Sequence, residues 1–85
     1  MVGNTFDALE VAFGLALRRA RLTAGMTQEQ LGLEAGIQRN FVSLIETGQN
    51  QPTITTIAKL ARALRRAPSA LVAEAESELR KSRKA

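Results

Sequence analysis

Two short predicted helices, residues 27–36 and an amphipathic one over 38–47, are joined by a very short turn around Gly36. A turn this short forces two helices to cross steeply, so the side chains at their contact must be small. Gly32, inside the first segment, costs about 1 kcal/mol relative to alanine in a helix, and close approach of the second helix would explain it. Gly36 supplies the left-handed backbone conformation that reverses the chain. Four apolar side chains would pack inside the resulting corner: Leu31, Ala35, Val42 and Ile45.

Glycine, proline and capping residues divide the remaining chain into further helical segments. Gly25 and Gly48 are placed as helix stops, Thr27 and Gln30 form a capping box, and Thr53 caps a later helix. Aromatic residues make up only 4% of the chain, so alanine and leucine must fill the core, which favours closely packed helices. We therefore expect one all-α domain of five helices, over residues 6–24, 27–36, 38–47, from 53, and from 69 to the basic end. The fourth helix should have an apolar face of Ile54, Ile57, Leu60, Ala61 and Leu64.

The charge of the 85-residue chain favours an anionic partner. The formal net charge is +4, and residues 18–66 alone carry a surplus of +5, with eight Arg or Lys against three Glu, although solubility alone can explain such a surplus. There is no histidine or cysteine, the eight acids form no pair on one helix face, and no serine has a base beside it, so we expect no catalytic site and no metal. We also expect no cofactor and, without a ligand-binding domain, no small-molecule ligand. No apolar run approaches the roughly 20 residues of a membrane span, and the N-terminus lacks the basic start of a signal peptide. We expect a cytoplasmic protein that is not an enzyme and does not bind a membrane.

The segment QEQLGLEAGIQRNFVSLIET, residues 28–47, resembles the helix-turn-helix of the lambda-repressor-like (Cro/CI, or XRE) family. The resemblance extends to FGLALRRAR as a first helix, AGMTQEQL as the entry, and IETGQNQPTITTIAKLARAL as the exit and fourth helix. It implies a five-helix DNA-binding domain over residues 13–73. Residues 1–12 would be an extension and the start of the first helix, and 74–85 the end of the fifth helix and a basic tail. Restriction–modification controller proteins are similar in size and layout.

Five side chains of the third helix are predicted to contact bases: Gln38, Arg39, Asn40, Ser43 and Leu44. At about 100° per residue, Asn40, Ser43 and Leu44 point away from the buried face, and Arg39 lies at its flank. Gln38 stands at the helix start, the end that such proteins lower into the major groove. Asparagine or glutamine can pair with adenine and arginine with guanine, while leucine offers only apolar contact, such as to a thymine methyl. In the alternative, Gln38 merely caps the helix, its polar neighbours are solvated, and Leu44 packs against a partner or neighbouring helix.

Other positions are expected to contact the DNA backbone or to fix the helices. The resemblance implies a phosphate contact for Gln28, and a helix N-terminus attracts anions; alternatively, Gln28 is only a good first-turn residue. The expected backbone contacts are Thr27, Gln28, Gln49 and Asn50, although the loop after the third helix lacks the Lys or Arg of many relatives. In relatives, an arginine late in the first helix pairs with a glutamate at the end of the third. The resemblance therefore implies a structural ion pair between Arg21 and Glu46.

The expected partner is double-stranded DNA, bound by a homodimer at a partly palindromic operator, because a domain this small reads few base pairs. The predicted dimer surface is the stripe Leu71, Val72, Ala75 and Leu79, and the rival surface is Phe6, Leu9 and Val11. RNA polymerase is a candidate further partner. The alternative function is a protein-interaction adapter or antitoxin-type module built on the same fold.

Overall fold

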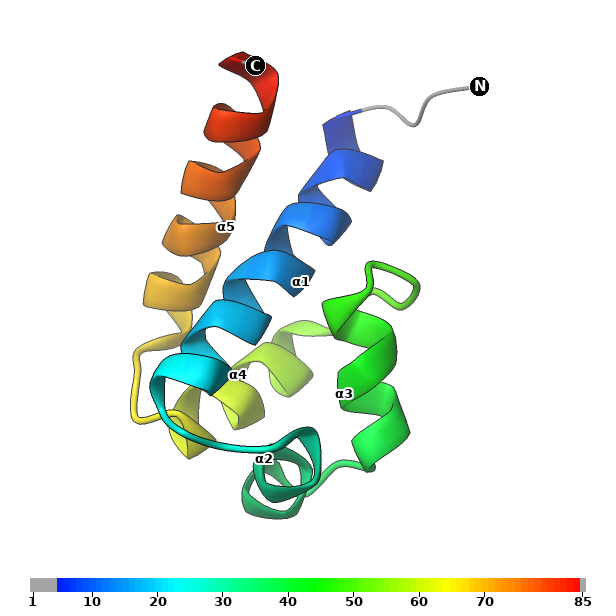
Figure 1. Cartoon of the computed structure of the whole chain (residues 1–85), viewed down its shortest axis with the longest axis vertical. Helices are drawn as coiled ribbons and strands as arrows, with labels where there is room; N and C mark the ends of the chain where they lie inside the picture. The colour runs from blue at the N-terminus through cyan, green and yellow to red at the C-terminus, as the bar shows by residue number, and fades with distance from the viewer. Residues whose placement is uncertain (1–4, 85) are drawn as a thin grey trace.

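The computed structural model describes residues 5–84, and every regular element in this range is an α-helix. The helices are α1 (Thr5–Thr23), α2 (Gln28–Ala35), α3 (Arg39–Glu46), α4 (Ile54–Ala63) and α5 (Pro68–Lys84) (Figure 1). The predicted all-α fold of five helices is therefore confirmed. The predicted ends differ by a few residues, because several terminal residues act as caps rather than helical positions.

The corner between α2 and α3 is built from local capping interactions. At the start of α2, the Gln30 N–H donates to Thr27 Oγ1 at 3.0 Å and the Thr27 N–H donates to Gln30 Oε1 at 2.8 Å. At its end, Gly36 has a φ of 76°, the left-handed conformation that the turn requires. A Cβ on Gly32 would lie 2.7 Å from the Ile37 carbonyl oxygen, so the turn approaches α2 too closely for any side chain there.

The core takes one large, fully buried side chain from each helix: Leu17, Leu31, Ile45, Leu60 and Leu71. Val42, Ala35 and Ala61 are also buried, as the periodicity predicts. The prediction for Ile54 is wrong, because this side chain is 86% exposed. Ile54 is the first residue of α4 and projects from the helix start, whereas Ile57 packs against the core and Leu60 is fully buried.

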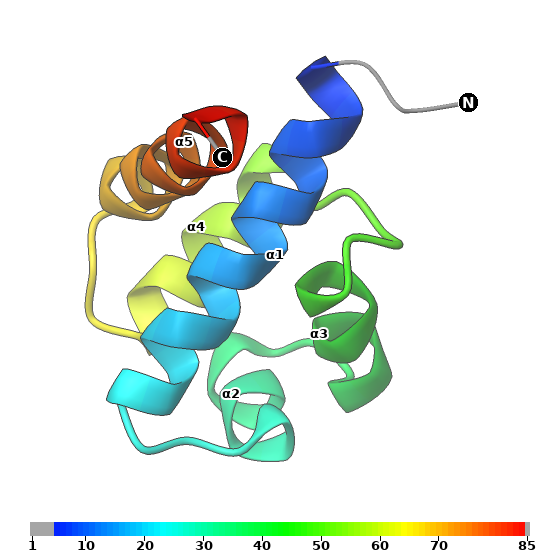
Figure 2. The same ribbon diagram turned by 45° about the horizontal axis from the view of Figure 1, so that its top comes forward.

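Helices α1 and α5 lie side by side and antiparallel, with α3 and α2 on the other side of α1 (Figures 1 and 2). Ion pairs from Arg19 to Glu78 and from Arg66 to Glu74 tie α5 to α1 and to the end of α4. Helix α3 packs by one face against α1 and α2. Its opposite face is exposed in the first turn and partly exposed one turn later.

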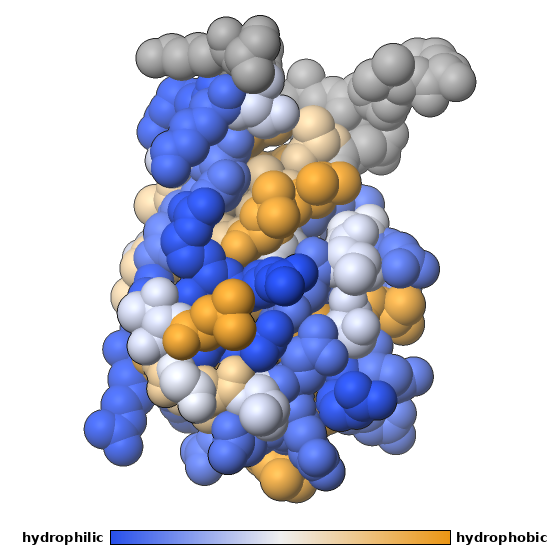
Figure 3. Space-filling view, viewed as in Figure 1, coloured by the Kyte–Doolittle hydropathy of each residue, from blue (hydrophilic) through white to orange (hydrophobic). Residues whose placement is uncertain are grey.

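The outer side of α1 carries an apolar stripe of Val11, Leu15 and Leu22, each about half exposed. Figure 3 shows hydrophobic side chains along α1 within a largely hydrophilic surface. Over residues 5–84, no helix is both long enough and apolar enough to span a membrane.

Candidate nucleic-acid interface

The outer face of α3 brings together the side chains that the sequence predicts as base contacts. Gln38, Arg39 and Asn40 are exposed in the first turn, whereas Ser43 and Leu44, one turn later, are partly exposed. The inner face is made by Val42 and Ile45, which are fully buried. The strong amphipathicity of the segment therefore places donor-rich side chains on the accessible side of a helix whose other side is fixed in the core.

Gln38 is the N-cap of α3, with φ −74° and ψ 147°, but its side chain makes no capping hydrogen bond. Its backbone carbonyl accepts from the N–H groups of Phe41 and Val42 instead. The side chains of Gln38 and Asn40 also make no hydrogen bond to any other residue in the described range. Gln38 therefore begins the helix through its backbone alone, and its side-chain amide and that of Asn40 are exposed. Both the base-contact prediction and the alternative of solvated side chains are compatible with this arrangement.

A buried ion pair joins α1 to the end of α3. Arg21 Nε donates to Glu46 Oε2 at 2.6 Å and Arg21 Nη2 donates to Glu46 Oε1 at 3.0 Å, with both residues less than a tenth exposed. Arg21 Nη1 also donates to the Met26 carbonyl at 2.9 Å, which fixes the entry to α2. These hydrogen bonds to Glu46 raise the pKa of the Arg21 guanidinium, so Arg21 stays charged wherever the protein is folded.

Gln28 is held by the same carboxylate. Its Nε2 donates to Glu46 Oε1 at 3.0 Å, so α2 is joined to this ion pair as well. The sequence assigned Gln28 to a DNA phosphate, and the structure shows that at least one of its amide protons has an internal partner. Thr27 is exposed beside it, and its hydroxyl oxygen accepts the capping hydrogen bond. Three helices thus converge on Glu46, which explains how a helix as short as α3 keeps its orientation.

The loop after α3 is folded back onto the helix end. The N–H groups of Gln49 and Asn50 donate to the Leu44 carbonyl at 2.9 and 3.2 Å. The Gln49 side chain donates to Thr47 Oγ1 at 2.9 Å, and Asn50 is partly buried. These two predicted backbone contacts therefore lie next to α3 in a loop whose position is fixed by the helix.

Gly14 is a positioning residue that the sequence interpretation missed. A Cβ at Gly14 would lie 2.7 Å from the Glu46 carbonyl oxygen and even closer to that of Ile45. The end of α3 thus rests directly on the backbone of α1, beside the Arg21–Glu46 pair. The available signal was a glycine within an otherwise alanine- and leucine-rich helix, which costs about 1 kcal/mol without a packing reason.

The predicted dimer surface divides into two groups. Leu71 and Ala75 are buried in the core of a single chain, so these two cannot form a contact surface between chains. They face inward because α5 packs along α1, which turns this side of the stripe toward the core. Val72 is 40% exposed, and Leu79 is partly exposed at a hollow that Val11 and Leu15 of α1 also line. The Phe6 side chain of the rival surface lies outside the described residues.

Residues 17–71 match a family model described as helix-turn-helix, and this stretch contains all of α2, α3 and α4. The match covers more than half of the chain. The chain belongs to the helix-turn-helix family, XRE type. The resemblance derived from residues 28–47 is therefore confirmed.

Two curated relatives of this helix-turn-helix chain are regulators. It is 35% identical over 51 residues to the uncharacterized HTH-type transcriptional regulator y4dJ of Sinorhizobium fredii, covering 60% of this chain and 66% of that protein. It is 33% identical over 57 residues to the control protein C.BamHI of Bacillus amyloliquefaciens, covering 66% of this chain and 70% of that protein. The chain thus spans about two thirds of the length of these relatives.

Solved structures agree with the helix-turn-helix fold. The restriction-modification controller protein C.AhdI from Aeromonas hydrophila is 39% identical, with a TM-score of 0.71, over 72% of this chain and 92% of that one. The clp gene regulator ClgR from Corynebacterium glutamicum has a TM-score of 0.86 over 89% of this chain and 81% of that one. At 24% identity, ClgR shows likeness of fold alone. The family is one of transcription regulators rather than enzymes.

Proposed function

We propose that this chain is a sequence-specific DNA-binding transcriptional regulator that inserts the start of α3 into the major groove. The observation that carries the proposal is the exposed polar first turn Gln38, Arg39 and Asn40, on a helix clamped by the buried Arg21–Glu46 pair. Base reading requires donors and acceptors held in a fixed register to the groove. The first turn supplies the donors and the ion pair supplies the register.

The individual roles follow from the chemistry of each side chain. Arg39 would pair with a guanine, Asn40 or Gln38 with an adenine, and Ser43 with either, while Leu44 makes apolar contact. Thr27, Gln28, Gln49 and Asn50 would contact the DNA backbone. We expect Gln28 to bind phosphate with the part of its amide that Glu46 does not use. Residues 13–73 would then act as the DNA-binding unit, flanked by residues 1–12 and 74–85.

We infer that the regulator works in the cytoplasm, without a cofactor, metal, small-molecule ligand or catalytic step. The net charge of +4 supports attraction to DNA. Two relatives, C.BamHI and C.AhdI, are a control protein and a controller protein of restriction–modification, which supports a similar role here. RNA polymerase remains a candidate partner at the promoter.

We propose that the chain binds a partly palindromic operator as a homodimer through Val72 and an adjoining apolar hollow. This hollow, of about 210 Å³, is lined in part by Leu9, Pro52, Ile57 and Val72. Ile57, in the lining of the hollow, belongs to α4, and Ile54 projects from the start of the same helix. In the proposed dimer, the Ile54 side chain of one copy enters the hollow of the other. In a two-fold dimer each chain would offer both the projection and the hollow.

The test is selection of bound sequences from a random DNA pool, followed by affinity measurements on the selected operator and on random DNA. Arg39→Ala and Asn40→Ala should each cost about 1–3 kcal/mol on the operator and much less on random DNA. Glu34→Ala, on the exposed side of α2, is the control and should bind the operator in preference to random DNA as the parent does. Equal losses on both DNAs would remove the base-reading role. If no sequence is selected and binding is not steep in salt, the adapter or antitoxin-type function is favoured.

A further inference from the structure

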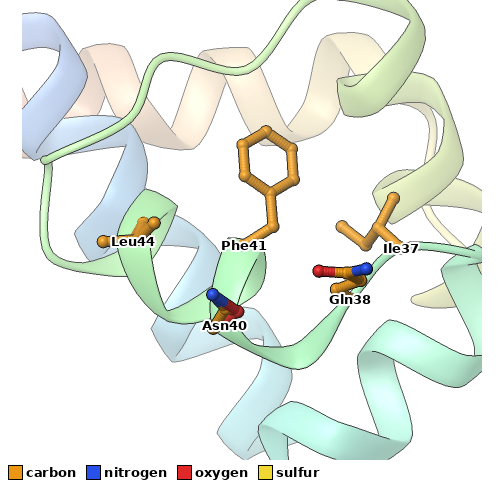
Figure 4. Close-up of a pocket in the computed structure, with 5 residues that line it drawn as sticks. All are labelled: Ile37, Gln38, Asn40, Phe41 and Leu44. Atoms are coloured by element: carbon orange, nitrogen blue, oxygen red, sulfur yellow. The ribbon is translucent and has the colours of Figure 1, made fainter.

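The outer side of α3 carries an open hollow of about 370 Å³, lined by Ile37, Gln38, Asn40, Phe41 and Leu44. In Figure 4, the ring of Phe41 lies between the side chains of Ile37 and Leu44, and Gln38 and Asn40 lie at the edge. The hollow therefore has apolar walls and two amide groups at its rim.

The apolar walls are held in place before any ligand arrives. Phe41 and Ile37 are partly buried and pack against the core. The Ile37 N–H donates to the Gly32 carbonyl at 2.9 Å and the Phe41 N–H donates to the Gln38 carbonyl at 3.1 Å. Leu44 lies within α3, and its carbonyl accepts from the N–H groups of the following loop. The backbone that carries the walls is thus fixed by the corner and the helix, and the side chains of Ile37 and Phe41 are also held by the core.

The chemistry of the hollow matches one feature of the major groove. The C5-methyl of thymine is the apolar group that distinguishes this base there, and its partner adenine presents the N6–H donor and the N7 acceptor that an amide can bind. Apolar walls beside amides that make no internal hydrogen bond therefore match a T·A pair, or neighbouring A and T positions. They match an unmethylated G·C pair poorly, because its major-groove edge is polar.

We propose that Ile37, Phe41 and Leu44 form a binding site for the C5-methyl group of an operator pyrimidine, while Asn40 or Gln38 reads an adjacent adenine. This inference rests on the proposed function, because it requires the outer side of α3 to face the major groove. It adds two specificity-determining residues, Ile37 and Phe41, that the sequence did not assign to DNA. The site does not distinguish the base that bears the methyl, so 5-methylcytosine fits it as thymine does.

The test uses the operator selected from the random pool, with each thymine replaced in turn by deoxyuridine, which removes only the methyl group. At one or more positions in each half-site, the parent chain should bind the uracil operator about fourfold more weakly, the value of one buried methyl. An operator with 5-methylcytosine at that position, paired with guanine, should be bound more tightly than the same operator with plain cytosine there.

Two variants connect the effect to the hollow. Leu44→Ala and Phe41→Leu should bring the ratio of thymine to uracil affinities at that position close to one, with circular dichroism confirming the helical fold. Leu33→Ala makes the same chemical change on α2, where the side chain is 77% exposed and outside the hollow, and should keep the full ratio.

The outcomes separate the two proposals. A parent that selects an operator but binds thymine and uracil operators equally at every position overturns this inference alone. The same holds if methyl discrimination survives unchanged in both Leu44→Ala and Phe41→Leu. A parent that selects no operator overturns the proposed function, and the methyl site falls with it.

Discussion

Glu46 is the residue on which the position of the reading helix most depends. Its carboxylate accepts three hydrogen bonds, two from Arg21 and one from Gln28, in a site almost closed to water. Removing one partner of a buried ion pair leaves the other charge without compensation, which typically costs about 3–5 kcal/mol. Glu46→Ala should therefore lower the free energy of unfolding by about this amount and weaken operator binding with it.

The measurement is a double-mutant cycle of Glu46→Ala with Arg21→Ala, followed by denaturant unfolding. Because each single variant leaves an uncompensated partner, the double variant should lose less stability than the sum of the single losses. Additive losses would contradict a direct interaction. Glu34→Ala again serves as control, since this carboxylate is exposed on α2.

Arg65 is also a residue under local strain. It has a φ of 60° at the end of α4, where the Arg66 N–H donates to the Ala61 carbonyl at 2.8 Å and closes the helix. A side chain costs about 1–2 kcal/mol in this left-handed conformation, whereas glycine adopts it readily. Arg65→Gly should raise the free energy of unfolding by about 0.5–1 kcal/mol after the greater chain entropy of glycine is subtracted. Arg65→Ala removes the same charge but keeps the strain, and an equal gain from it would refute this explanation.

At the scale of elements, the crossing of α1 and α3 depends on Gly14. Alanine has the higher helix propensity by about 1 kcal/mol, so propensity alone predicts that Gly14→Ala stabilises α1. The structure predicts the opposite, because the added Cβ would meet the carbonyl oxygens of Ile45 and Glu46. Backbone atoms in a helix cannot move aside as a flexible side chain can.

We expect Gly14→Ala to lower the free energy of unfolding by about 1–3 kcal/mol, as overpacking does, and to weaken operator binding by displacing the end of α3. Thermal unfolding and operator affinity measure the two effects. Leu15→Ala, at a half-exposed position of the same helix, should change neither much. A Gly14→Ala protein as stable as the parent would mean that α3 does not rest on α1 in this way.

At the scale of the whole molecule, the proposed dimer predicts which face joins two chains. A symmetric dimer would set two copies of α3 about 34 Å apart, one turn of DNA. Val72→Glu places a charge on the proposed surface at a 40% exposed position, so the chain should stay folded but sediment as a monomer and bind the operator more weakly. Leu22→Glu, on the exposed stripe of α1, is the matched control and should remain a dimer. A dimeric Val72→Glu protein together with a monomeric Leu22→Glu protein would indicate that the dimer surface lies on α1 instead.

The sequence by itself determined the five helices, their caps, the corner at Gly36 and the outward first turn of α3. These features depend on residues within a few positions of each other, through capping bonds, backbone conformation and the helical period. The Arg21–Glu46 contact joins residues distant in the chain, and it was anticipated only through resemblance to relatives.

Only the tertiary structure decided contacts between elements that are remote in sequence. One is the hydrogen bond from Gln28 to Glu46, and another is the close approach of α3 to Gly14. A third is the burial of Leu71 and Ala75 beside an exposed Val72. Periodicity shows that a helix has an apolar face, but which part of that face is covered depends on the neighbour packed against it. For the same reason, Ile54 matches the apolar pattern of α4 and yet is exposed, whereas Ile57, three residues later, packs against the core.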